Sequence, residues 1–254
     1  EPQEATPPPF ALNHLHSVLY TSGTTGKPKG VLLTFGNHLW SAMGSVLNLG
    51  LRPDDRWLAV LPFFHVGGLS ILLRSVLYGI PTVIHSRFDP VLVNRSIVED
   101  HITLTSVVST MLARMIDDWG ASPYPETLRC VLVGGGPVPY PLLQECQKRR
   151  IPVVQTYGLT ETASQAATLA PEDAQVKAGS AGKPLFPTEL KIWRNGQFVP
   201  PGVEGEIVVR GPNVSIGYDH RPQETESAFR GGWFHTGDWG YLDEEGYLYV
   251  LDRR

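Results

Sequence analysis

The chain has 254 residues, enough for one large or two ordinary domains with a well-buried core. Hydrophobic residues make up 42% of it, and the formal net charge of −4 excludes a highly charged disordered chain and argues against a broadly basic nucleic-acid-binding protein. Two cysteines are too few for a disulfide framework, and no apolar run reaches the roughly 18 residues of a membrane span. We therefore expect a cytoplasmic protein, and homo-oligomer formation stays open.

The two ends of the sequence resemble cut ends. The chain begins without Met, and the Thr-Pro-Pro-Pro stretch at residues 6–9 cannot be helical, which indicates a linker-like tail over residues 1–16. At the other end the chain stops directly after a strand-like run. We expect a fragment of a longer protein.

Strand-like and helix-like segments alternate through the first two thirds of the chain. Apolar runs predict strands at residues 17–20, 57–61, 81–85, 104–108, 128–133 and 153–156. Helical spacing predicts helices at residues 35–48, 69–77, 91–101, 111–119 and 142–149. In the second of these helices Arg74 falls on the polar stripe, so we expect it on the surface. The alternation indicates βαβ units and an α/β core with a mainly parallel sheet over residues 17–178.

The pattern changes near residue 179. Short strand-like runs at residues 190–193, 205–209, 239–242 and 247–251 are separated by Gly, Pro and Asn turns, and no helical period appears among them. We expect a β-rich subdomain over residues 179–251.

A loop rich in hydroxyl groups, glycine and lysine follows the first predicted strand. Residues 20–30 read Tyr-Thr-Ser-Gly-Thr-Thr-Gly-Lys-Pro-Lys-Gly. Glycines let backbone N–H groups approach phosphate oxygens, hydroxyls add donors and lysine adds positive charge. The loop is not a Walker A motif, because only two residues separate Gly23 from Gly26 and Pro28 follows Lys27, which disfavours a P-loop phosphotransferase.

This loop resembles the phosphate-binding signature of the adenylate-forming enzymes, the superfamily of acyl-CoA synthetases, luciferases and peptide-synthetase adenylation domains. Further segments resemble that superfamily's motifs in the same order, at residues 134–137, 157–161, 205–218, 234–238 and 251–253. The resemblance spans nearly all of residues 17–254. It implies the large N-terminal domain of such an enzyme, with residues 252–254 as the start of a hinge and the C-terminal domain absent.

The resemblance also implies an activity and a set of site residues. Such enzymes use Mg²⁺ and ATP to convert a carboxylate into an acyl-AMP and pyrophosphate, and the ligases then transfer the acyl group to CoA. The implied catalytic residues are Lys29, Thr160, Glu161 and Arg253, with Glu161 also the Mg²⁺ ligand. The implied nucleotide-binding residues are Thr21, Ser22, Gly23, Thr24, Thr25, Gly26, Gly135, Gly136, Pro137, Tyr157 for adenine and Asp238 for ribose.

The resemblance also implies which acyl substrate the enzyme uses. The segments at residues 62–70, 134–137 and 160–165 are most similar to those of ligases that join 2-succinylbenzoate to CoA in menaquinone biosynthesis. The implied substrate contacts are His65, Gly134 and Ser164. Two alternatives stay open: another aryl or medium-chain acyl-CoA ligase, or a nucleotide-binding module without turnover. Residues 1–254 alone are expected not to ligate CoA.

Overall fold

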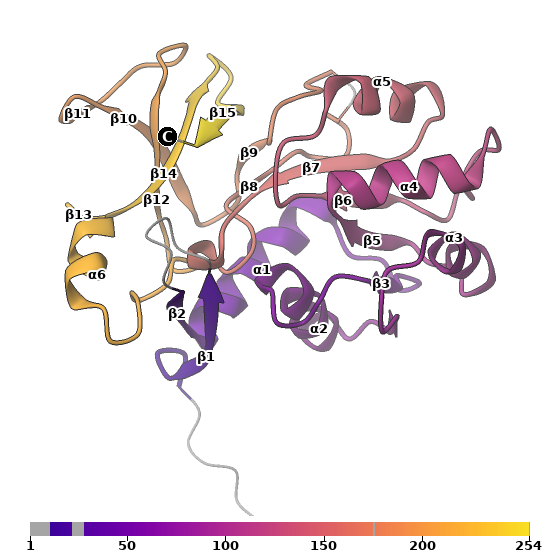
Figure 1. Ribbon diagram of the computed structural model, residues 1–254, viewed down its shortest axis with the longest axis horizontal. Helices are drawn as coiled ribbons and strands as arrows, with labels where there is room; N and C mark the ends of the chain where they lie inside the picture. Colours follow the sequence, from indigo (N-terminus) through magenta and orange to yellow (C-terminus); the bar gives the residue numbers. More distant parts are fainter. Residues whose placement is uncertain (1–10, 22–27, 175, 254) are drawn as a thin grey trace, which may run out of the picture.

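The structure, a computed structural model, describes residues 11–21, 28–174 and 176–253. Within them the chain forms a seven-stranded mixed sheet, a six-stranded antiparallel sheet and a two-stranded hairpin. In Figure 1 the antiparallel sheet and one short helix occupy the left side of the view, and the mixed sheet and the longer helices occupy the right side.

The mixed sheet carries the predicted parallel core. Its strand order is β4-β3-β5-β6-β7-β8-β9, parallel as far as β7 and antiparallel beyond it. The strands are β3 (Trp57–Ala59), β4 (Thr82–Ile84), β5 (Leu104–Val107), β6 (Cys130–Val133), β7 (Val153–Tyr157), β8 (Ala167–Thr168) and β9 (Lys183–Pro184). The predicted α/β class is confirmed. The proposed division at residue 179 stays a prediction.

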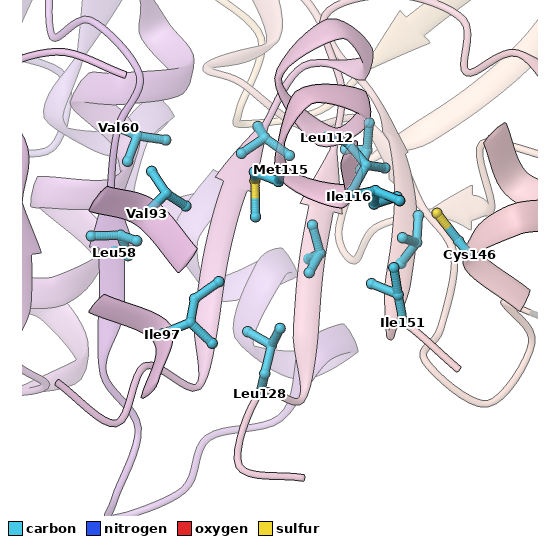
Figure 2. Packing of buried hydrophobic residues seen from close by; sticks show 14 of the residues in the cluster. Leu58, Val60, Val93, Ile97, Leu112, Met115, Ile116, Leu128, Cys146 and Ile151 are labelled. Carbon is cyan, nitrogen blue, oxygen red and sulfur yellow. The ribbon is translucent and has the colours of Figure 1, made fainter. Parts of the chain in front are cut away.

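Helices cover both faces of this sheet, because its strands are apolar on both sides. The helices are α1 (Phe35–Leu49), α2 (Val66–Tyr78), α3 (Pro90–Glu99), α4 (Ser109–Trp119) and α5 (Tyr140–Lys148). Leu58 of β3 belongs to a core that includes residues of α3, α4 and α5, whereas Trp57 and Ala59 belong to a core that includes residues of α1 and α2. Figure 2 shows the first of these cores, where Met115 of α4 lies among side chains of neighbouring strands and helices. Both cysteines are free and buried.

The orientation of α2 differs from the prediction. The apolar stripe was expected to face the core, but Val76 is 82% exposed and Arg74 is 2% exposed. Polar contacts fix this orientation, since Ser70 Oγ donates to Ser164 Oγ and Arg74 Nη2 donates to Ser41 Oγ, both across 3.3 Å. Gly68, near the start of α2, packs against the segment that leads into this helix, where a Cβ would lie 2.3 Å from the carbonyl oxygen of Pro62. The predicted surface position of Arg74 is therefore wrong.

The antiparallel sheet corresponds to the predicted β-rich region. Its strands are β10 (Glu189–Arg194), β11 (Gln197–Phe198), β12 (Gly205–Arg210), β13 (Phe229–Arg230), β14 (Trp233–Leu242) and β15 (Leu248–Arg253). One helix, α6 (Pro222–Ala228), lies before β13, where none was expected. None of its residues is buried, so it has no apolar stripe for a periodicity argument to detect.

The N-terminal hairpin leads directly into α1. Strand β1 (Leu15–Thr21) pairs with β2 (Lys29–Thr34), a strand that was not predicted. Thr34 then caps α1 in a capping box with Asn37. The side-chain Nδ2 of Asn37 also donates to the carbonyls of Pro212 and Val214. These bonds tie the start of α1 to the loop after β12. None of the helices in the described ranges has both the length and the apolar composition that a membrane span requires.

Candidate active site

A cleft of about 1160 Å³ lies at the carboxyl ends of β6 and β7 and is also lined by residues of β12, β14 and α6. The carboxyl ends of parallel strands are the usual location of ligand sites in open α/β sheets. The volume exceeds that of most small-ligand pockets. A second cavity, of about 230 Å³, lies at the opposite ends of these strands beside Arg129 and Cys146, away from the motif segments.

Residues from all six motif segments, the loop at residues 20–30 included, line this cleft together. Those that the sequence had singled out are Thr21, Lys29, Gly135, Gly136, Pro137, Tyr157, Thr160, Glu161 and Asp238. Five more, Ser22, Gly23, Thr24, Thr25 and Gly26, lie outside the described residues. Pairing of Thr21 with Lys29 brings the two ends of that loop to the cleft.

One wall carries Tyr157 and Asp238. Tyr157 is the last residue of β7 and is 9% exposed, and its hydroxyl donates to Oδ2 of Asp238 across 2.8 Å. Asp238 lies in β14, where its pairing partner in β15 is Arg253, the residue implied to contact ribose or phosphate. The aromatic face and the carboxylate thus lie at adjoining positions, as binding of one nucleoside would require.

A second wall carries Glu161, Tyr218 and Lys29. Glu161 lies in a short 3-10 helix, η1 (Thr160–Thr162), and is 8% exposed. Its Oε1 accepts a hydrogen bond of 2.8 Å from the hydroxyl of Tyr218, and Lys29 Nζ lies 5.2 Å from the centre of the Tyr218 ring. A buried carboxylate held in this way beside the cleft fits a Mg²⁺ ligand, since Mg²⁺ usually takes one or two carboxylates and completes its shell with phosphates and water.

Three predicted substrate contacts do not line the cleft. His65 is exposed at the N-cap of α2, with its ring centre 4.5 Å from that of Phe64. Ser164 accepts the hydrogen bond from Ser70 described above. Gly134 packs against Thr156, and a Cβ at this position would lie 2.8 Å from Thr156 Cγ2. Their substrate role stays a prediction.

Arg74 of α2 is a buried cationic residue in contact with Ser41 of α1. Arg74 Nε has no hydrogen-bond partner among the described residues, and Nη2 reaches only a hydroxyl. Burial, together with the nearby His16 and Arg74, lowers the pKa of His38 to about 4. His38 is therefore neutral at physiological pH, and the positive charge of Arg74 has no carboxylate beside it in the described structure.

Several cleft residues were missed by the sequence reading. Tyr218, Glu206, Arg230 and His235 all line the cleft. His235 lies within the Phe-His-Thr-Gly-Asp motif, and Glu206 and Tyr218 lie within the matched segment at residues 205–218. Those motifs were the available signal, but they do not reveal which side chains turn toward Asp238 or Glu161.

The family model described as AMP-binding enzyme matches residues 1–219. The chain belongs to this AMP-binding enzyme family. The match confirms the expected relationship, and it covers the segments that supply Thr21, Lys29, Tyr157 and Glu161 to the cleft.

Relatives in the AMP-binding enzyme family are highly similar over nearly the whole chain. A 2-succinylbenzoate–CoA ligase of Geobacillus sp. (strain WCH70) is 59% identical over 245 residues, which are 96% of this chain and 50% of that protein. The solved o-succinylbenzoate CoA synthetase of Bacillus subtilis in complex with the acyl-adenylate intermediate OSB-AMP is 53% identical, with a TM-score of 0.92 over 96% of this chain and 50% of that one.

A second structure of the Bacillus subtilis synthetase, in complex with ATP and a magnesium ion, is also 53% identical, with a TM-score of 0.91 over 96% of this chain and 51% of that one. These matches confirm the fold expected of an AMP-binding enzyme. The chain spans about half the length of the relatives that it matches.

Proposed function

We propose that the whole protein is an acid–CoA ligase that activates 2-succinylbenzoate with ATP, and that the present chain carries its nucleotide and acyl sites. The observation that carries this proposal is the convergence of the motif residues on one cleft of about 1160 Å³. The named activity of relatives at 53–59% identity supports the choice of substrate.

The nucleoside would bind along β7 and β14. The flat ring of Tyr157 would stack on adenine, and the Asp238 carboxylate would accept hydrogen bonds from the ribose hydroxyls. Hydrogen bonds to a charged acceptor are the stronger kind, each with a net contribution of about 1.5–3 kcal/mol. Arg253 would act from β15, opposite Asp238.

The phosphates would bind between the N-terminal hairpin and η1. Lys29 supplies a cation, and the hydroxyls of Thr21 and Thr160 supply donors along the same wall. Glu161 would hold Mg²⁺, which when bound neutralises phosphate charge. The glycines at 135 and 136 leave the cleft floor free of side chains.

The chemistry would proceed in two steps. A carboxylate oxygen of the acid attacks the α-phosphorus of ATP, the bond to the bridging oxygen breaks, and pyrophosphate leaves with that electron pair. The CoA thiolate then attacks the acyl carbon, and AMP leaves. Donors placed around the phosphates stabilise the charge that develops in the first step.

2-Succinylbenzoate differs from simpler acids by its second carboxylate, which needs polar partners in the site. Benzoate and medium-chain acids have no second carboxylate. His65 and Ser164 stay candidate contacts for the succinyl group.

Acid-dependent exchange of labelled pyrophosphate into ATP tests the proposal. We expect exchange with 2-succinylbenzoate to exceed that with benzoate by about 100-fold or more in kcat/KM, because simpler acids leave polar groups of the site unpaired. Equal kcat/KM for the two acids would refute the substrate assignment. Absence of any acid-dependent exchange by the whole protein would refute the proposed adenylation.

We also propose a cytoplasmic location, because Cys130 and Cys146 are free thiols.

A further inference from the structure

Strand β14 departs from regular pairing at the wall of the cleft. Glu206 of β12 pairs with Trp239, and Val208 pairs with His235, so that Ile207 alone stands opposite residues 236–238. This is a β-bulge, a feature that interrupts ladder hydrogen bonds and redirects side chains, often beside active sites. Asp238 is the last residue of this bulge and faces Tyr157.

Side chains satisfy the backbone of the bulge in place of the ladder. Gly237 has a φ of +74°, and its N–H donates to Glu206 Oε1 across 3.1 Å. The N–H of Asp238 donates to Thr236 Oγ1, and that hydroxyl donates to the carbonyl of Ile207, across 3.0 and 2.7 Å. The position of Asp238 therefore depends on contacts with two consecutive residues of β12.

Glu206 contacts the bulge at a second point. Its Oε2 lies 2.9 Å from His235 Nδ1, the residue at which regular pairing with β12 resumes. The His235 side chain is 6% exposed, so this contact is largely shielded from water. Arg230 Nη2 lies 3.1 Å from the same nitrogen and 3.8 Å from Glu206 Oε2, where its charge offsets that of the carboxylate. The Glu206 carboxylate thus contacts both the His235 ring, which precedes the bulge, and the backbone amide of Gly237 within the bulge.

We propose that Glu206 is a positioning residue that fixes the Asp238 carboxylate for recognition of the ribose hydroxyls. This inference rests on the proposed function, in which Asp238 binds ribose. Without Glu206 the amide of Gly237 loses its acceptor, and the bulge can adopt other conformations. The ordering of Asp238 would then oppose nucleotide binding, which is the loss that a preorganised site avoids.

The test measures ribose recognition rather than affinity alone. Calorimetry gives the Kd of ATP, 2′-deoxy-ATP and 3′-deoxy-ATP for the native chain and for Glu206→Ala, Asp238→Ala and the double variant. We expect the native chain to prefer ATP over at least one deoxy analogue by about 10-fold, because a hydrogen bond to a charged group contributes roughly that factor. The preference should fall below about 3-fold in each single variant, and the double variant should match Asp238→Ala.

Three comparisons separate positioning from a general effect on the fold. Glu206→Gln keeps an oxygen that can accept from Gly237, so it should retain most of the preference for ATP. Glu206→Val removes both acceptors with a residue type that favours strands, so the result does not depend on one variant folding. Glu189→Gln is the matched control, because Glu189 lies in the same sheet but pairs with Arg210, away from the cleft.

The outcomes distinguish this inference from the proposed function. If Asp238→Ala leaves the native preference unchanged, the ribose assignment of Asp238 fails. If Asp238→Ala abolishes the preference while folded Glu206→Ala or Glu206→Val retains it, the positioning role of Glu206 is overturned. An additive loss in the double variant would also overturn it, because Glu206 would then act independently of Asp238.

Discussion

The hydroxyl of Tyr157 donates a hydrogen bond to Oδ2 of Asp238 across 2.8 Å and so joins two strands whose residues are 81 positions apart in the chain. Tyr157 ends β7 of the mixed sheet, and Asp238 lies in β14 of the antiparallel sheet. The proposed adenine contact and the proposed ribose contact therefore support each other directly, across the boundary between the two sheets.

Two replacements of Tyr157 separate the contribution of its hydroxyl to ATP binding from that of its aromatic ring. Tyr157→Phe keeps the ring but removes the donor to Asp238, so we expect ATP affinity to fall by about 0.5–1.5 kcal/mol, or roughly 2- to 10-fold. Tyr157→Ala should lose about 1–3 kcal/mol more, because base stacking is lost as well. Calorimetric titration with ATP measures both, and Tyr249→Phe, outside the cleft, serves as the control. Equal affinity for the Phe variant and the native chain would contradict the coupling.

The hydrogen bond between Tyr218 and Glu161 predicts that replacing either residue weakens the affinity for Mg²⁺. Tyr218→Phe removes the hydrogen bond that orients Glu161, and loss of such an outer partner typically weakens metal affinity by about 10- to 100-fold. Glu161→Gln should weaken it further, because the ligand loses its charge. The Mg²⁺ concentration that gives half-maximal ATP binding is the measured quantity. Tyr241→Phe should not change it, and an unchanged value for Glu161→Gln would exclude Glu161 as the ligand.

The ion pair between Asp55 and Arg129 predicts a stability effect at the amino-terminal ends of β3 and β6. Asp55 has no exposed side-chain surface, and its Oδ2 lies 2.5 Å from Arg129 Nη2. Breaking a buried pair on one side costs about 3–5 kcal/mol, so we expect a loss of that size for Asp55→Asn in urea unfolding. Glu189→Gln removes one partner of an exposed pair and should have little effect.

The same pair also predicts acid sensitivity. Burial favours a raised pKa for Asp55, but hydrogen bonds from Arg129, from the amide of Arg52 and from Thr103 outweigh it, and the pKa lies below the ordinary 3.8. The stabilisation is therefore complete above about pH 4 and is lost as the pH falls through the pKa of the folded state. Asp55→Asn should flatten the pH dependence of unfolding in this acidic range. An unchanged dependence would contradict the assigned cause.

His38 predicts a second pH dependence, at milder acidity. Its pKa is lowered from 6.5 to about 4, mainly by burial, so the unfolded chain binds a proton there between pH 6.5 and 4 while the folded chain does not. Stability should fall as the pH decreases through this range, by up to roughly 3 kcal/mol. In urea unfolding His38→Gln should reduce that slope, whereas His220→Gln, at a side chain 93% exposed, should not. Equal slopes in all three would contradict the prediction.

The fold was predictable where hydrophobic pattern alone decides structure. The strands β3, β5, β6 and β7 are short apolar runs buried on both faces, and each was located from its sequence. The helix α6 was not, because none of its residues is buried. Periodicity also assigned Arg74 to the surface, since its contact with Ser41, 33 residues earlier in the chain, cannot be read from helical spacing.

The candidate site was predictable to the level of motifs but not of contacts. Tyr157, Glu161 and Asp238 were identified within conspicuous segments, and the structure brings them to one cleft. The residues that hold them, Tyr218 and Glu206, were missed. Their roles depend on the pairing of distant strands and on a bulge in β14, and neither can be read from local sequence.

The measurement that tests the central claim most directly is binding of a hydrolysis-resistant acyl-adenylate mimic, 2-succinylbenzoyl-sulfamoyl-adenosine, to this chain. We predict one bound molecule per chain, displacement by ATP, and affinity that falls by about 10-fold or more both in Asp238→Ala and when a benzoyl group replaces the 2-succinylbenzoyl group. Absence of binding by the folded chain, or binding that neither change weakens, would contradict the proposed nucleotide and acyl sites.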